Sequence, residues 1–178
     1  MKFLLPFALI AGPALAECPA PPDHSAAIDD ALAQLQASGN ELEARDHNAT
    51  LWELWLDAPD ARAQALLDEG MARRESQNFL GAIEVLTRLV DYCPTYAEGY
   101  NQRAFSYFVA REYESAVADL DRALDLNPRH IGALSGMALA LIELDRPTEA
   151  IPWLRRAVEL HPYLAERALL ERLPGEDI

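Results

Sequence analysis

The side chains that could carry chemistry are few and widely spaced. They are Cys18, Cys93, His24, His47, His130 and His161. No Gly-rich phosphate loop, no metal-ligand spacing and no nucleophile motif accompanies them. Asp119, Asp121 and Asp125 lie on one predicted helix, where an acidic face serves solubility. His130 and His161 fall in predicted turns, and we expect both to be solvated. The sequence therefore predicts no enzyme, no catalytic residue, no metal site and no cofactor.

The elements that would have to position any site recur every 34 residues. Four kinds of position repeat in one frame: a bulky residue, a small one, a second small one, and a closing proline. They are Leu66, Tyr100 and Leu134; Gly70, Ala104 and Ala138; Ala82, Ala116 and Ala150; and Pro94, Pro128 and Pro162. Such a period is typical of stacked helix-turn-helix units. We therefore expect an all-α fold, an α-solenoid of stacked antiparallel helix pairs.

The middle unit shows the packing logic. Tyr100, Ala104 and Phe108 share one face of a first helix because they lie four residues apart. Small residues at Ala104 and Ala116 let the two helix backbones approach closely. One such pair cannot bury its own apolar face, so stability requires stacking on neighbouring units.

This pattern resembles the tetratricopeptide repeat family. The resemblance implies three repeats over residues 63–164, divided into 63–96, 97–130 and 131–164. An extended lead-in at 17–24 and an N-terminal capping hairpin at 25–62 precede them, and a C-terminal capping helix and tail follow at 165–178. Three positions depart from the pattern: Arg73 replaces a Tyr, Leu89 replaces an Ala, and Pro152 is expected to kink its helix. Trp52 and Trp55 of the hairpin are expected in a core rather than on a ligand platform.

Residues 1–16 have the features of a secretory signal peptide: one Lys, a short apolar run, and small residues at Ala14 and Ala16. We expect cleavage before Glu17 and a periplasmic or secreted protein of exported bacterial type. An N-terminal membrane anchor is the alternative, but the apolar run is short for a bilayer. After cleavage no stable membrane insertion is expected. A net charge of −14 disfavours nucleic acid as a partner.

The two cysteines would then meet in a compartment that permits disulfides. In a stack of antiparallel pairs, Cys93 ends a second helix and Cys18 precedes the first helix, so both fall on one edge. We expect a disulfide between Cys18 and Cys93. The alternative is a buried, inert Cys93 with Cys18 free in the lead-in.

The resemblance also implies a concave groove lined by the first helix of each repeat. The groove residues expected to bind peptide are Leu67, Met71, Arg74, Asn101, Gln102, Phe105, Phe108, Leu139 and Ile142. The Lys and Arg clamp with which some family members hold a chaperone carboxylate is absent, since Leu67, Met71, Gly132 and Gly136 occupy those positions. Amides at Asn101 and Gln102 are expected to bond a peptide backbone. Alternatively, the hairpin or the C-terminal helix covers Phe105 and Phe108.

The predicted function is an exported adaptor or scaffold that binds a peptide segment of another envelope protein. Two alternatives remain open at this point. The chain could self-associate as a structural solenoid, or it could act as a small-ligand-binding accessory protein. Groove residues, rather than the fold, distinguish these functions.

Overall fold

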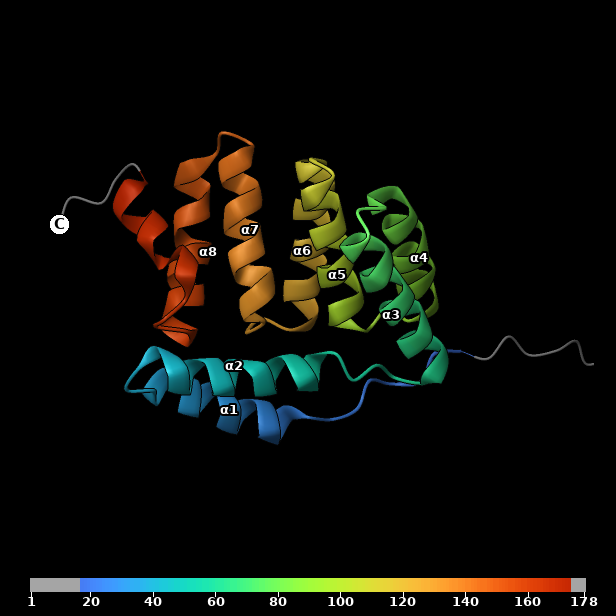
Figure 1. The fold of residues 1–178 in the computed structure, drawn as a ribbon, viewed down its shortest axis with the longest axis horizontal. Helices are drawn as coiled ribbons and strands as arrows, with labels where there is room; N and C mark the ends of the chain where they lie inside the picture. The colour runs from blue at the N-terminus through green and yellow to red at the C-terminus, as the bar shows by residue number, and fades with distance from the viewer. Residues whose placement is uncertain (1–16, 174–178) are drawn as a thin grey trace, which may run out of the picture.

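A computed structural model describes residues 17–173 as eight α-helices and one 3-10 helix, without a β-strand in that range (Figure 1). The helices are α1 (Ser25–Ala37), α2 (Glu41–Trp55), α3 (Ala61–Glu75), α4 (Phe79–Tyr92), α5 (Ala97–Val109), α6 (Tyr113–Leu126), α7 (Ile131–Glu143), α8 (Pro147–Leu160) and η1 (Ala165–Arg172). The expected signal peptide at 1–16 lies outside the described residues, as do residues 174–178. No described helix combines the length and apolar character that crossing a bilayer requires.

Three helix pairs, α3 with α4, α5 with α6 and α7 with α8, form the stack. The repeated small residues Ala82, Ala104, Ala116, Ala138 and Ala150 are all fully buried between helices. At Gly70 an added Cβ would lie only 2.5 Å from Leu86 Cγ. The small side chains are therefore required by the close approach of the two helices. The all-α solenoid predicted from the 34-residue period is confirmed.

The turn between the two helices of each repeat has the same backbone conformation, and it recurs every 34 residues. Gln77, Arg111 and Asp145 have φ values of 63°, 65° and 58°, and each is followed by a backbone bond back to the first helix. These N–H to O distances are 2.9 Å for Asn78 to Arg73, Glu112 to Tyr107 and Arg146 to Leu141. This is the geometry of a left-handed helix cap, in which a single residue of positive φ reverses the chain.

The N-terminal hairpin, α1 and α2, packs differently from the expected cap. It lies across the ends of the repeat helices, with its turn beneath α8 (Figure 1). Its buried Leu32, Leu35 and Leu51 meet Ile131 at the start of α7, and Gln36 Nε2 donates to the backbone oxygen of Glu159 at 3.0 Å. The hairpin thus joins the first repeat to the third along one edge. It does not cover the outer face of α3 and α4.

That outer face of the first repeat is instead made polar by its own side chains. Glu69 pairs with Arg73 at 2.6 Å and with Arg88 at 3.8 Å. The guanidinium of Arg62 stacks 3.9 Å from the ring centre of Tyr92. A polar outer face is what the end of an array needs, because no further unit covers it. The departure at Arg73 from the repeat pattern is explained by this position.

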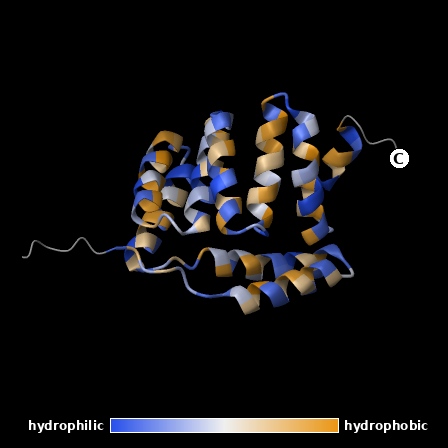
Figure 2. Ribbon diagram, turned by 180° about the vertical axis from the view of Figure 1, so that it is seen from behind, coloured by the Kyte–Doolittle hydropathy of each residue, from blue (hydrophilic) through white to orange (hydrophobic). Residues whose placement is uncertain are grey.

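Hydrophobic and hydrophilic residues occur in patches along the helices, as amphipathic packing requires (Figure 2). α8 continues through Pro152, which lies on its exposed side. At the other end of the chain, Leu169 and Leu170 of η1 and the following Leu173 pack against the core of the third repeat. The expected C-terminal helix is therefore present, although as a 3-10 helix.

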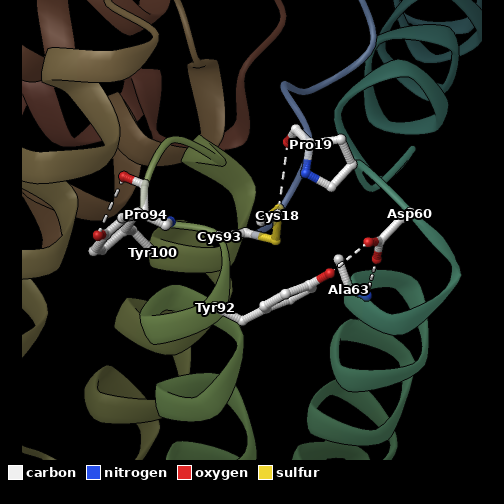
Figure 3. The surroundings of a disulfide bond; sticks show 8 residues. All are labelled: Cys18, Pro19, Asp60, Ala63, Tyr92, Cys93, Pro94 and Tyr100. Atoms are coloured by element: carbon white, nitrogen blue, oxygen red, sulfur yellow. Dashed lines mark hydrogen bonds between the residues drawn. A yellow bond between two sulfur atoms is a disulfide. The ribbon is translucent and has the colours of Figure 1, made fainter. Parts of the chain in front are cut away.

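The lead-in is tied to the stack by a disulfide between Cys18 and Cys93, whose Cα atoms are 5.1 Å apart (Figure 3). The predicted pairing is confirmed. Cys93 caps the C-terminus of α4, and beside it the Tyr92 hydroxyl donates to Asp60 Oδ2 at 2.6 Å. Asp60 in turn accepts from the Ala63 N–H at 2.8 Å and begins α3. The bridge therefore fixes the path of residues 18–24 beside the first repeat.

Candidate functional site

One pocket is lined by the first helices of all three repeats and has a volume of about 360 Å³. We call it the inner pocket. Its lining residues are Trp52, Arg74, Asn101, Gln102, Ala104, Phe105, Phe108, Leu120, Gly132, Ser135, Gly136, Leu139 and Glu166. It lies mainly between α5 and α7, with single contributions from α2, α3, α6 and η1.

The floor of the inner pocket is apolar. Ala104 and Leu120 are buried beneath it, and Gly136 leaves room because a Cβ there would lie 3.2 Å from Leu120 Cδ2. Phe105 forms a side wall and remains 49% exposed. The hairpin and η1 thus leave Phe105 open, contrary to the alternative in which the ends of the chain fill the groove. A partly exposed aromatic beside an apolar floor can bury a side chain of a ligand.

Arg74 forms the cationic side of the inner pocket. Its guanidinium lies 4.4 Å from the ring centre of Phe105, and its Nη1 donates to Gln102 Oε1 at 2.6 Å. Burial lowers the pKa of Arg74, while the nearby carboxylates of Glu75 and Glu98 oppose that shift. An arginine remains charged under these conditions because its usual pKa is far above neutrality. Arg74 therefore holds the Phe105 ring in place as a charged group.

A buried carboxylate, Glu98, lies behind this wall and is 1% exposed. It accepts from Gln102 Nε2 at 2.5 Å and from Asn101 Nδ2 at 3.2 Å to each of its oxygens. The two amides are thus occupied with Glu98. A buried carboxylate must satisfy its own oxygens within the protein, so a peptide backbone would compete with Glu98 for these amides, and their bonding to a peptide stays a prediction.

His130 completes the shell around Glu98 and is fully buried. His161 is buried as well, so the expectation that both turn histidines are solvated is wrong. The Nε2 of His130 lies 2.6 Å from Glu98 Oε2, and its Nδ1 accepts from the Ala133 N–H at 3.2 Å. The neutral ring with its proton on Nε2 satisfies both contacts. Trp55 stacks on the ring at a centroid distance of 4.0 Å, because the hairpin crosses this edge of the stack.

These contacts form a continuous path from the hairpin to the inner pocket. The path runs from Trp55 through His130 and Glu98 to Gln102, and then to Arg74 and Phe105. Trp52, one turn away on α2, closes one end of the pocket beside Gly132, where a Cβ would come 2.7 Å from the tryptophan ring. Gly132 is thus required by Trp52 rather than by a ligand.

Six of the nine predicted groove residues line the inner pocket: Arg74, Asn101, Gln102, Phe105, Phe108 and Leu139. The other three do not. Leu67 is fully buried with Leu86 and Leu89, Met71 packs beside them, and Ile142 packs into the core of the third repeat. Leu67 packs against Leu86 and Leu89 of α4. Its position within the repeat does not reveal this, because the first repeat has no preceding unit against which to pack.

Two lining residues lay outside the repeats and were not predicted, namely Trp52 from the hairpin and Glu166 from η1. No local sequence signal marks them, since both reach the pocket only through the tertiary fold. Elsewhere in residues 17–173 the structure assembles no group of three or more His, Cys, Asp or Glu side chains suited to a metal ion.

Comparison with known proteins agrees with this architecture. A family model described as Tetratricopeptide repeat matches residues 107–173. A TPR repeat-containing protein of Rhizobium etli is 29% identical over 146 residues, which cover 82% of this chain and 71% of that protein. The Tetratricopeptide repeat protein 36 homolog of Nematostella vectensis is 32% identical over 43% of this chain and 42% of its own length. The chain thus spans less than half of this second relative.

Solved structures show the same stack of helices. The first TPR domain of Spaghetti (RPAP3), bound to the HSP90 peptide SRMEEVD, is 26% identical with a TM-score of 0.61 and covers 62% of this chain and 89% of that one. The Arabidopsis OM64 TPR domain has a TM-score of 0.62 at 21% identity over 64% of this chain and 95% of that one, a likeness of fold. Together with the 34-residue period, these similarities support a tetratricopeptide repeat protein.

Proposed function

We propose that this chain is an adaptor that binds a peptide segment of another protein in the inner pocket. The observation that carries the proposal is the apolar floor beside Phe105, a large aromatic side chain that is left 49% exposed. The pocket draws on all three repeats, so a ligand there would contact each of them. The RPAP3 domain, similar in fold and sequence, was solved with a peptide bound.

The driving force would be burial of an apolar side chain against Phe105, Phe108 and Leu139. Burial of apolar surface contributes on the order of 25 cal/mol per Å². Asn101 and Gln102 also donate to Glu98, so the backbone of a ligand would compete with that carboxylate for their N–H groups. Apolar anchors, rather than backbone hydrogen bonds to these amides, would supply the affinity.

Phe105→Ala tests the proposal, with Leu80→Ala as the matched control. Leu80 is 73% exposed on α4 and does not line the inner pocket. Each oxidised variant is used to capture partners from an extract of the native organism's cell envelope, and mass spectrometry compares the captured proteins. We expect Phe105→Ala to lose partners that the wild type and Leu80→Ala retain. Equal capture by all three, with helix content unchanged, would contradict a peptide site at this pocket.

We further propose that the adaptor works outside the cytoplasm, in the periplasm or as a secreted protein, and that its partner belongs to the cell envelope. Two features support export: the signal-peptide pattern of residues 1–16 and the disulfide between Cys18 and Cys93. The intact mass of the chain isolated from cells, measured with a thiol-reactive label and without reductant, tests this. We expect a chain that begins at Glu17 and takes up no label. A full-length or doubly labelled chain would contradict export.

A further inference from the structure

The charge around the inner pocket is negative on balance. Arg74 and Glu166 line it, Glu98 lies directly behind its wall, and Glu75 acts on Arg74 from the same helix. His130, which lies beside Glu98 in this network, contacts that carboxylate through Nε2 and accepts from the Ala133 N–H through Nδ1. These groups stand within a chain of net charge −14. A ligand of negative charge would therefore be repelled from the pocket, both locally and at a distance.

The positive charge of Arg74 is already used by the protein. It donates to Gln102, lies over the face of Phe105, and is partly neutralised by Glu98 behind Gln102. A carboxylate of a ligand would have to compete with these contacts. Arg74 therefore shapes the wall of the pocket rather than offering an open site for an anion.

Glu166 is placed differently. It lines the inner pocket from η1, is partly exposed, and forms no ion pair among the described residues. A carboxylate at the rim of an apolar pocket favours a cation that arrives beside an apolar anchor. The chain thus combines an apolar floor with an acidic rim.

We propose that the inner pocket selects a basic segment, in which a bulky apolar side chain enters beside Phe105 and a neighbouring Lys or Arg pairs with Glu166. This inference rests on the proposed adaptor function and specifies the chemistry of the partner. It separates this chain from the RPAP3 domain, whose bound peptide SRMEEVD is acidic at its C-terminal end.

Selection from a random peptide library displayed on phage tests the preference directly. The oxidised wild-type chain selects peptides after the library has been depleted on Phe105→Ala, so that the survivors depend on the inner pocket. We expect the survivors to carry net positive charge together with an aromatic or large aliphatic residue. Acidic or uncharged survivors would overturn the inference and leave the adaptor function standing. No enrichment over Phe105→Ala would overturn both.

The place of the cation is tested with a labelled peptide from that selection. Glu166→Lys and Glu171→Lys make the same change in net charge on the same short helix, but Glu171 does not line the pocket. We expect about tenfold weaker binding for Glu166→Lys, because an attraction becomes a repulsion, and about twofold for Glu171→Lys. Equal weakening in both variants would show that only the overall charge matters and would overturn the pairing with Glu166. Circular dichroism of both variants checks that helix content is unchanged.

Discussion

The N-terminal hairpin and the three repeats are both built from antiparallel helix pairs, yet they pack by different rules. Each repeat brings its helices together at small residues such as Ala104 and Ala116, which are fully buried. The hairpin buries Ala31 and Ala44 together with Leu35, Leu51 and Trp55, and lies across the ends of the repeat helices. Where small residues recur on a helix face, pairs can stack side by side. The hairpin lies outside that 34-residue recurrence and packs on the ends of the stacked pairs.

The two regions also differ in what their interfaces contain. The repeats meet mainly through apolar side chains, with a few polar bonds such as Arg74 to Gln102. The hairpin instead meets the stack through Trp55, which stacks on His130 of the buried His130–Glu98 pair, and the lead-in is tied to the stack by the disulfide. Apolar stacking tolerates variation in partner, but a buried carboxylate is stable only when all its hydrogen bonds are made. We therefore expect the position of the hairpin to depend on a few contacts, and that of each repeat on many.

Trp55→Ala should give the largest effect and separate the two regions. Removing this side chain leaves a cavity and exposes His130 and Glu98, so we expect the free energy of unfolding to fall by about 3–5 kcal/mol. Trp153→Ala, at a partly exposed tryptophan on α8, is the control and should cost less. Hydrogen exchange should show lost protection mainly in α1 and α2. Equal loss in α3–α8 would mean that hairpin and repeats unfold as one unit.

Replacing both cysteines by serine should weaken the attachment of the N-terminal hairpin to the repeats, in this case by removing the disulfide. The bridge joins residues 75 positions apart, and its loss should lower the free energy of unfolding by about 2–4 kcal/mol. Because Cys18 leads into the hairpin, exchange protection should fall more in α1 than in α5 and α6. Adding a reductant should destabilise the wild type and leave the double variant unchanged. A double variant as stable as the oxidised wild type would contradict a structural role for the bridge.

Tyr96, which bonds the end of the hairpin, should make the free energy of unfolding depend on alkaline pH. Burial raises the pKa of Tyr96, with smaller contributions from nearby carboxylates, and its hydroxyl donates to the Trp55 backbone oxygen at 2.8 Å. Above its usual pKa of 10.0 the unfolded chain loses this proton while the folded chain keeps it, so stability falls as pH rises.

Tyr96→Phe provides the measurement. We expect it to cost about 1 kcal/mol at neutral pH through the lost hydrogen bond. Above pH 10 its stability should fall less steeply than that of the wild type, by about 1.4 kcal/mol per pH unit, because one proton no longer takes part. Urea unfolding at a series of pH values gives both quantities. Parallel curves for the two proteins would show that Tyr96 ionises in the folded state as it does in the unfolded chain.

The smallest expected effect lies in the repeats and has the opposite sign. Gln77 holds a φ of 63°, which glycine adopts without a steric penalty. Gln77→Gly should therefore stabilise the chain by about 0.5–1 kcal/mol, after the greater freedom of glycine in the unfolded chain is taken into account. Gln77→Ala serves as the control and should not stabilise. Thermal unfolding measures the difference, and stabilisation by both variants would contradict the steric explanation.

Sequence reasoning succeeded where the information was periodic. The 34-residue spacing was sufficient to predict the three repeats and the close-packed alanines. Six of the thirteen residues that line the inner pocket could also be named, because the first helices of successive repeats face the same side. It failed for Leu67, which is buried instead of lining the groove, and for His130, which is buried instead of solvated. Each failure arises where a segment distant in sequence covers or replaces the expected surroundings.

The sequence alone therefore determined the helices, their pairing and the inner face, because helical spacing and small residues act between neighbours along the chain. Only the tertiary structure decided that the hairpin crosses the edge of the stack and that Glu98 and His130 are buried under Trp55. It also decided that Trp52 and Glu166 complete the inner pocket. The physical reason is the sequence separation between the residues that make these contacts. Contacts between residues far apart in the chain depend on where whole helices come to rest, and no local pattern records that position.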